Sequence, residues 1–174
     1  MGLYLAYDAA QQPLAHAPED ARPRLLIAVR PEDIAFSKVV LGDEFNTVIC
    51  HSYEDACAAI VSGVDLVTCG VHFDNGRVFD LLRRVRGDPG TAELPFFILL
   101  GAGSRYSPAI IQGIRAAAKL LKVTAFTDLN RFADKLGKEE SLAALRQGIR
   151  DAIAIRPRTT SNQECTAQIR PRRV

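Results

Sequence analysis

The chain has 174 residues, with 22 Lys and Arg against 20 Asp and Glu, and a formal net charge of +2. Hydrophobic residues make up 48% and charged residues 24% of the sequence, which is typical of a globular protein large enough to bury its own core. Its apolar runs are far shorter than the roughly 20 residues that a membrane-spanning helix needs, so we expect no contact with a membrane.

Charge is distributed unevenly along the chain. Residues 155–174 carry a net charge of +4, which leaves about −2 on the rest. This basic tail is rich in Pro and small polar residues, so we predict that it is disordered, and without interleaved aromatic residues it does not favour nucleic-acid binding. Residues 1–23 are predicted to form a flexible leader that lacks the features of a secretory signal. We therefore expect one folded domain, residues 24–154.

Apolar runs and helix signals alternate along this domain. Five apolar runs are predicted as strands, in chain order Arg24–Val29, Thr47–His51, Val64–Cys69, Leu94–Leu100 and Val123–Thr127. Helices are predicted at Pro31–Leu41, Tyr53–Ser62, Val78–Val85, Pro108–Leu121 and Glu139–Ile153. Pro31 suits a first helical position, Gly42 ends that helix, and Ser52 with Asp55 resembles a capping box.

This strict alternation indicates a doubly wound α/β fold. Strands separated by helices pair in parallel through right-handed crossovers, which place helices on both faces of the sheet. Five such units in about 130 residues favour the flavodoxin-like strand order 2-1-3-4-5 over a larger sheet.

Residues 65–101, DLVTCGVHFDNGRVFDLLRRVRGDPGTAELPFFILLG, carry a resemblance to a known family. Their layout of an apolar strand, a loop with a glycine, the helix DLLRRVR and the strand LPFFILL resembles the receiver domain of two-component response regulators, the CheY-like proteins. The resemblance extends from about Arg24 to Ile153. It implies that the chain works in signal transduction.

The resemblance also implies four kinds of site residue, from which this sequence departs. Such receivers hold Mg²⁺ on an acidic pair after the first strand, phosphorylate an Asp ending the third, and use a Thr or Ser and a Lys ending the fourth and fifth. The corresponding positions here are Val29 and Arg30 for the acidic pair, Gly70 for the phosphoacceptor, Leu100 (or Gly101, one residue later) for the hydroxyl, and Asp128 or Leu129 for the lysine. Phosphoryl transfer needs clustered carboxylates for the cation and a fixed ammonium. We therefore predict a degenerate receiver, or pseudo-receiver.

Other charged residues fall near the same edge of the predicted sheet. Glu32 and Asp33 are interpreted as charges at a helix N-terminus, and Asp74 as part of the turn Asp74-Asn75-Gly76. Arg30 is predicted to fill the vacated site and to pair with Asp74. Gly101 and Arg105, in a glycine-containing loop after the fourth strand, are candidate contacts for an anion.

Metal and nucleophile patterns are weak. Cys69 with His72, and Cys50 with His51, lie near strand ends, but the paired spacing of a zinc module is missing. The four cysteines show no disulfide framework, which favours reduced thiols and a cytoplasmic location. No nucleophile motif is present, so we predict no catalytic residue, no metal and no cofactor.

The resemblance further implies that the fourth helix, fifth strand and fifth helix form a surface for protein partners. Residues there that could make contacts are Tyr106, Ile110, Phe126 and Phe132. The sequence therefore predicts an atypical receiver that binds a sensor kinase or other signalling protein, or a second copy, without phosphorylation. One alternative is a small-ligand or anion sensor using the strand-end cleft, and another is a receiver phosphorylated on Asp74.

Overall fold

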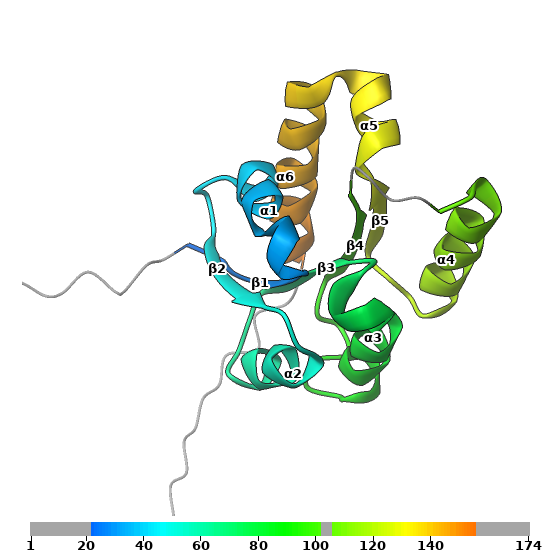
Figure 1. Ribbon diagram of the computed structural model, residues 1–174. Helices are drawn as coiled ribbons and strands as arrows, with labels where there is room; N and C mark the ends of the chain where they lie inside the picture. The colour runs from blue at the N-terminus through cyan, green and yellow to red at the C-terminus, as the bar shows by residue number, and fades with distance from the viewer. Residues whose placement is uncertain (1–21, 102–105, 156–174) are drawn as a thin grey trace, which may run out of the picture.

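The computed structural model describes residues 22–101 and 106–155, and within these ranges five parallel strands form one sheet (Figure 1). Their order is β2-β1-β3-β4-β5, as predicted. The strands are β1 Arg24–Ala28, β2 Asn46–Cys50, β3 Leu66–Gly70, β4 Phe96–Leu100 and β5 Ala125–Asp128.

Helices cover both faces of the sheet, which also confirms the predicted architecture (Figure 1). Their bounds are α1 Ile34–Leu41, α2 Tyr53–Val61, α3 Val78–Gly87, α4 Pro108–Leu120, α5 Leu129–Leu136 and α6 Lys138–Ile155. Side chains of α2, α3 and α4 pack in one hydrophobic cluster, and those of α1, α5 and α6 pack in another.

The strand sequences are continuously apolar because both faces of the sheet are buried. Along β1, Leu26 and Ala28 belong to the cluster beneath α2 and α3, whereas Leu25 and Ile27 belong to the cluster beneath α1 and α6. Side chains of a strand alternate between faces, so a strand covered on both sides has no polar positions to reveal its period.

Two predicted helix starts are confirmed. The Ser52 hydroxyl accepts a hydrogen bond from the Asp55 backbone N–H at 3.1 Å and opens α2, and Ser107 caps α4 in the same way at the backbone N–H of Ile110. The first predicted helix instead begins with a 3₁₀ turn, Pro31–Asp33, before α1. Strand ends differ from the prediction by one or two residues, which is the usual uncertainty of element boundaries.

The prediction missed α5, which follows β5 directly. Asp128 ends the strand and caps the helix, because its carboxylate accepts a hydrogen bond from the Arg131 backbone N–H at 3.3 Å. Gly137, with φ at +86°, then ends α5 and allows the chain to enter α6. The helix predicted at Glu139–Ile153 is α6, which the structure extends to Lys138–Ile155, and α5 is an additional helix before it.

Most of the predicted leader and nearly all of the basic tail lie outside the described residues. Among residues 22–101 and 106–155, no helix is long and apolar enough to cross a membrane. Cys50, Cys57 and Cys69 are free thiols, and burial raises the pKa of Cys69 well above its ordinary value.

Candidate functional site

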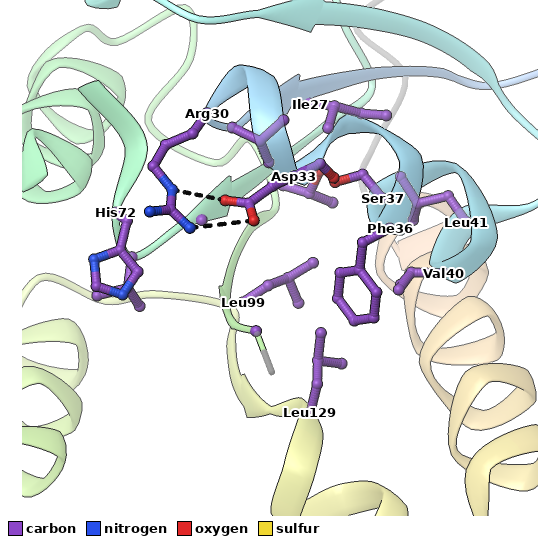
Figure 2. A pocket seen from close by; sticks show the side chains of 15 residues that line it. Ile27, Arg30, Asp33, Phe36, Ser37, Val40, Leu41, His72, Leu99 and Leu129 are labelled. Carbon is purple, nitrogen blue, oxygen red and sulfur yellow. Dashed lines mark hydrogen bonds and ion pairs between the residues drawn. The ribbon is translucent and has the colours of Figure 1, made fainter. Parts of the chain in front are cut away.

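A cavity of about 460 Å³ opens where the carboxyl ends of the central strands meet α1 and the start of α5 (Figure 2). Apolar side chains form most of its wall: Ile27, Val29, Phe36, Val40, Leu41, Val71, Leu99 and Leu129. Arg30, Asp33, Ser37, Thr68, Gly70, His72 and Gly101 complete it. Ligands of open parallel α/β sheets bind at this edge, so the cavity lies where the fold places a site.

The hydroxyl groups of the wall are engaged within the protein. Thr68 Oγ1 donates a hydrogen bond to the Leu26 carbonyl at 3.2 Å, and Ser37 Oγ donates to the Asp33 carbonyl at 2.9 Å. The hydroxyl hydrogens of both side chains are therefore already used within the protein, and neither is a free donor to a ligand.

Arg30 stands at the polar side of the cavity and is held by two nearby acids. Its Nε and Nη2 donate to the Asp33 carboxylate at 2.9 and 3.2 Å, and its Nη1 lies 3.2 Å from Glu32 Oε1. Figure 2 shows the paired contact with Asp33 as dashed lines. Hydrogen bonding to the Asp33 carboxylate raises the pKa of the Arg30 guanidinium, which stays charged at every working pH.

The predicted pair between Arg30 and Asp74 is wrong. The Asp74 carboxylate instead accepts the backbone N–H of Tyr53 at 2.9 Å and lies 3.4 Å from Arg77 Nη1. Asp74 and Asn75 do form a tight turn, with φ at +40° and +56°. This turn directs the Asp74 carboxylate towards the start of α2. Arg30 pairs instead with Glu32 and Asp33 of its own 3₁₀ turn, two and three residues further along the chain.

Of the positions that the resemblance matches to the receiver site, Arg30 is cationic, and the others that line the cavity are apolar or lack a side chain. Val29, Gly70 and Gly101 line the cavity, and Leu129 begins α5 beside them. A Cβ added to Gly70 would lie 3.6 Å from Val29 Cγ1, so the two positions are neighbours. Asp128, the other candidate for the lysine position, is occupied as the cap of α5.

Leu100 does not line the cavity, contrary to its predicted place. It is buried in the cluster beneath α2 and α3, and Leu99 and Gly101 face the cavity on either side of it in the chain. Of the two residues predicted for the hydroxyl position, Gly101 lines the cavity and Leu100 does not, because neighbouring residues of a strand point to opposite faces.

The histidines near the strand ends have partners other than a metal. His51 Nδ1 lies 2.8 Å from the Val29 carbonyl, and the His72 ring stacks on Tyr106 at a centroid distance of 4.8 Å, with its Nδ1 3.2 Å from the Tyr106 hydroxyl. Within the described ranges, no three His, Cys, Asp or Glu side chains come together as a metal site. Arg105 and residues 102–104 of the glycine-containing loop lie outside those ranges.

A second hollow, about 290 Å³, lies between α4 and α5 over β5. Its lining joins two aromatic rings, three basic side chains and the two last residues of β5: Phe126, Phe132, Arg115, Arg131, Lys135, Thr127 and Asp128. The Arg115 guanidinium lies 5.3 Å from the centre of the Phe126 ring. Of the predicted contact residues, Ile110 is half exposed, whereas Tyr106 turns inward onto His72.

Comparisons with known proteins place the fold. No protein-family profile matches the chain, and no curated protein matches it. Solved structures do. A sensor protein from Polaromonas sp. JS666 matches with a TM-score of 0.57 at 19% identity, covering 76% of this chain and 97% of its own. The signal receiver domain of a histidine kinase from Syntrophus aciditrophicus matches with a TM-score of 0.57 at 16% identity, covering 80% and 96%.

A third match holds a metal. The receiver domain of a sensor histidine kinase from Pseudomonas aeruginosa PAO1, with a magnesium ion coordinated in its active-site cleft, matches with a TM-score of 0.57 at 12% identity, covering 77% of this chain and 99% of its own. At these identities the likeness establishes architecture. Residues 22–155, apart from the gap at 102–105, have the fold of the response-regulator receiver domains.

Proposed function

We propose that this protein is a pseudo-receiver, which takes part in signal transduction through protein contacts and is not phosphorylated. The observation that supports the proposal most is the set of residues at the strand ends. Val29, Gly70, Gly101 and Leu129 offer neither a carboxylate for a cation, nor an acceptor for a phosphoryl group, nor an ammonium.

Charge supports the same proposal. A phosphoryl group in transfer needs a divalent cation on clustered carboxylates. The Asp33 carboxylate beside the cavity is bound to Arg30, whose positive charge would repel the cation. Asp74, the alternative phosphoacceptor, is only 20% exposed and holds the Tyr53 N–H and Arg77. An anion sensor is also disfavoured, because Glu32 and Asp33 already neutralise Arg30.

A titration followed by amide NMR tests the absence of phosphorylation. We expect that Mg²⁺, and then Mg²⁺ with beryllofluoride, an analogue of an aspartyl phosphate, leave the amide signals of Val29, Gly70 and Asp74 unshifted. A receiver with the full set of acidic and basic residues, titrated in parallel, verifies the reagents. Saturable shifts that require both reagents would contradict the proposal and reveal a relocated phosphorylation site.

The hollow over β5, between α4 and α5, is the surface that we propose for the partner, and it is called the groove from here on. Three cations, Arg115, Arg131 and Lys135, line it together with two aromatic rings, and Asp128 is the one acid in this lining. Aromatic side chains and arginines are enriched where proteins bind each other. The groove therefore suits a signalling protein that presents acidic side chains beside an apolar one. Two copies meeting groove to groove would bring like charges together, so the partner is not expected to be a second copy.

Molar mass measured by light scattering tests that choice. We expect the monomeric mass of 19.0 kDa from low to high protein concentration, in both 50 mM and 500 mM salt. A dimer that forms only in high salt would contradict the expected monomer, because two copies would then meet on this face once salt screens their like charges. An Arg131→Glu variant should in that case dimerise in low salt as well. A dimer at low salt that survives Arg131→Glu would exclude this groove as its interface.

The cysteines agree with an intracellular signalling role. Cys50, Cys57 and Cys69 are free, as expected for thiols in a reducing compartment. A cytoplasmic location is part of the proposal.

A further inference from the structure

The cavity beneath α1 is not needed for signalling by protein contact alone. We propose that it binds a small, uncharged and mainly apolar molecule, of about the size of a two-ring aromatic compound. This site goes beyond the proposed function, and its occupation does not depend on whether the protein is phosphorylated.

The size of the cavity is the first observation. Protein interiors are packed to a density of about 0.75, and voids larger than a water molecule are few. A hollow of about 460 Å³ falls within the range of small-molecule sites, roughly 300–1,000 Å³. Leaving its aliphatic and aromatic wall against water is unfavourable, and an apolar occupant would remove that surface from water.

The apolar and polar side chains lie on different sides of the cavity, and this distribution determines how a ligand would be oriented. Figure 2 shows Phe36, Val40 and Leu41 on the α1 side, Leu99 beside Phe36 and Leu129 below it, whereas Arg30 and His72 lie at the opposite side. Phe36 is 39% exposed, so it forms part of the rim. An apolar ring would therefore lie among α1, Leu99 and Leu129, with any polar group directed towards His72.

The charges of the wall select an uncharged ligand. Each nitrogen of the Arg30 guanidinium lies within 3.2 Å of a carboxylate oxygen from Asp33 or Glu32. An anionic ligand would have to displace one of these acids and would meet the other. A cation would meet Arg30 itself. Thr68 and Ser37 are neutral and offer no counter-charge, and their hydroxyl hydrogens already donate to backbone carbonyls.

Binding of two matched probes tests the proposal. We expect 2-naphthol, uncharged at pH 7, to bind saturably to the full chain and to shift the amide signals of Val29, Gly70 and Leu99 in an NMR titration. We expect 2-naphthoate, of similar shape but anionic, to bind about tenfold more weakly or not at all, which corresponds to about 1.4 kcal/mol or more. No saturable binding of 2-naphthol, or tighter binding of 2-naphthoate, would overturn the proposal.

Filling the cavity gives the second arm of the test. A Leu99→Phe variant places a larger side chain in the wall and is expected to weaken 2-naphthol binding about tenfold or more, equivalent to about 1.4 kcal/mol. Leu120→Phe is the matched control, because Leu120 is 83% exposed on α4 and outside the cavity, and it should bind as the wild type does.

Gly101→Val is a second filling variant in case Leu99→Phe does not fold. A Cβ at residue 101 would lie 3.8 Å from Phe36 Cε1, an ordinary contact, and the branched side chain would narrow the rim. Cooperative thermal unfolding identifies the variants that are folded. Unchanged 2-naphthol affinity in the folded filling variants would place the probe elsewhere and overturn the proposal.

Discussion

An Arg86→Ala variant is expected to lose about 2–4 kcal/mol in free energy of unfolding, measured by urea denaturation. The half-buried Arg86 donates three hydrogen bonds to backbone carbonyls: from Nε to Lys122 at 3.1 Å, and from Nη1 to Ala92 at 2.9 Å and Leu94 at 2.8 Å. The variant leaves these carbonyls without the charged donor. Burial lowers the pKa of the guanidinium, but it remains protonated at neutral pH.

The matched control is Arg83→Ala. Arg83 is an exposed residue of the same helix that pairs with Asp80, and removing such a pair should change the free energy of unfolding by less than about 1 kcal/mol. Arg86→Lys keeps the charge but loses the several N–H donors of the guanidinium. Its free energy of unfolding should therefore lie between those of the wild type and Arg86→Ala. Equal stabilities of Arg86→Ala and Arg83→Ala would show that the three contacts carry no net stabilisation.

Loss of the Arg86 hydrogen bonds is also expected to destabilise the proposed partner surface. Lys122 lies in the connection between α4 and β5, with φ at +55°, and Arg86 fastens this connection to the segment that precedes β4. Ala118 is the buried residue of α4, and Ile111 and Ile114 pack against the core only partly buried, so α4 buries less of its surface than α3 does. We therefore expect faster amide exchange in α4 of Arg86→Ala than in α4 of Arg83→Ala.

A Phe73→Ala variant is expected to cost about 3–5 kcal/mol in free energy of unfolding. Phe73 is fully buried and stands in the turn that follows β3, between His72 of the cavity wall and Asp74. Truncation leaves a void in the core at the residue that directly precedes Asp74 and Asn75, whose positive φ values depend on the surrounding structure. Urea denaturation monitored by circular dichroism measures the effect.

Phe36→Ala supplies the comparison for this second variant. It removes the same ring from a position that is 39% exposed at the cavity rim, so the loss should be about 1 kcal/mol. If Phe73→Ala proved no more costly than Phe36→Ala, the turn after β3 would not depend on the buried ring.

The sequence was sufficient for the sheet and its strand order because the five apolar runs are separated by helix caps and stops that act locally. It was also sufficient to predict the Ser52 and Ser107 caps. The α5 helix had a readable signal, since Leu129, Phe132, Ala133 and Leu136 follow helical spacing. At eight residues, however, it follows a strand without a loop, so its pattern merges with that of the strand.

The site was harder to predict, for physical reasons that differ between residues. The pair of Arg30 with Asp33 is local, at a spacing of three, and could have been preferred over the distant Asp74. Leu99 and Leu100 face opposite sides of the sheet, and an error of one residue in the predicted register exchanges the two sides. The Arg86 contacts could not be predicted, because their acceptors are carbonyls whose directions are set only by the complete fold.

The stacking of His72 on Tyr106 joins two parts of the molecule. His72 belongs to the cavity wall, and Tyr106 immediately precedes Ser107, which caps α4. A ligand that moves His72 would therefore change the free energy of the chain that starts α4. Coupling between binding sites is reciprocal, so a partner that binds α4 more tightly when the cavity is filled must raise the affinity of the cavity by the same factor.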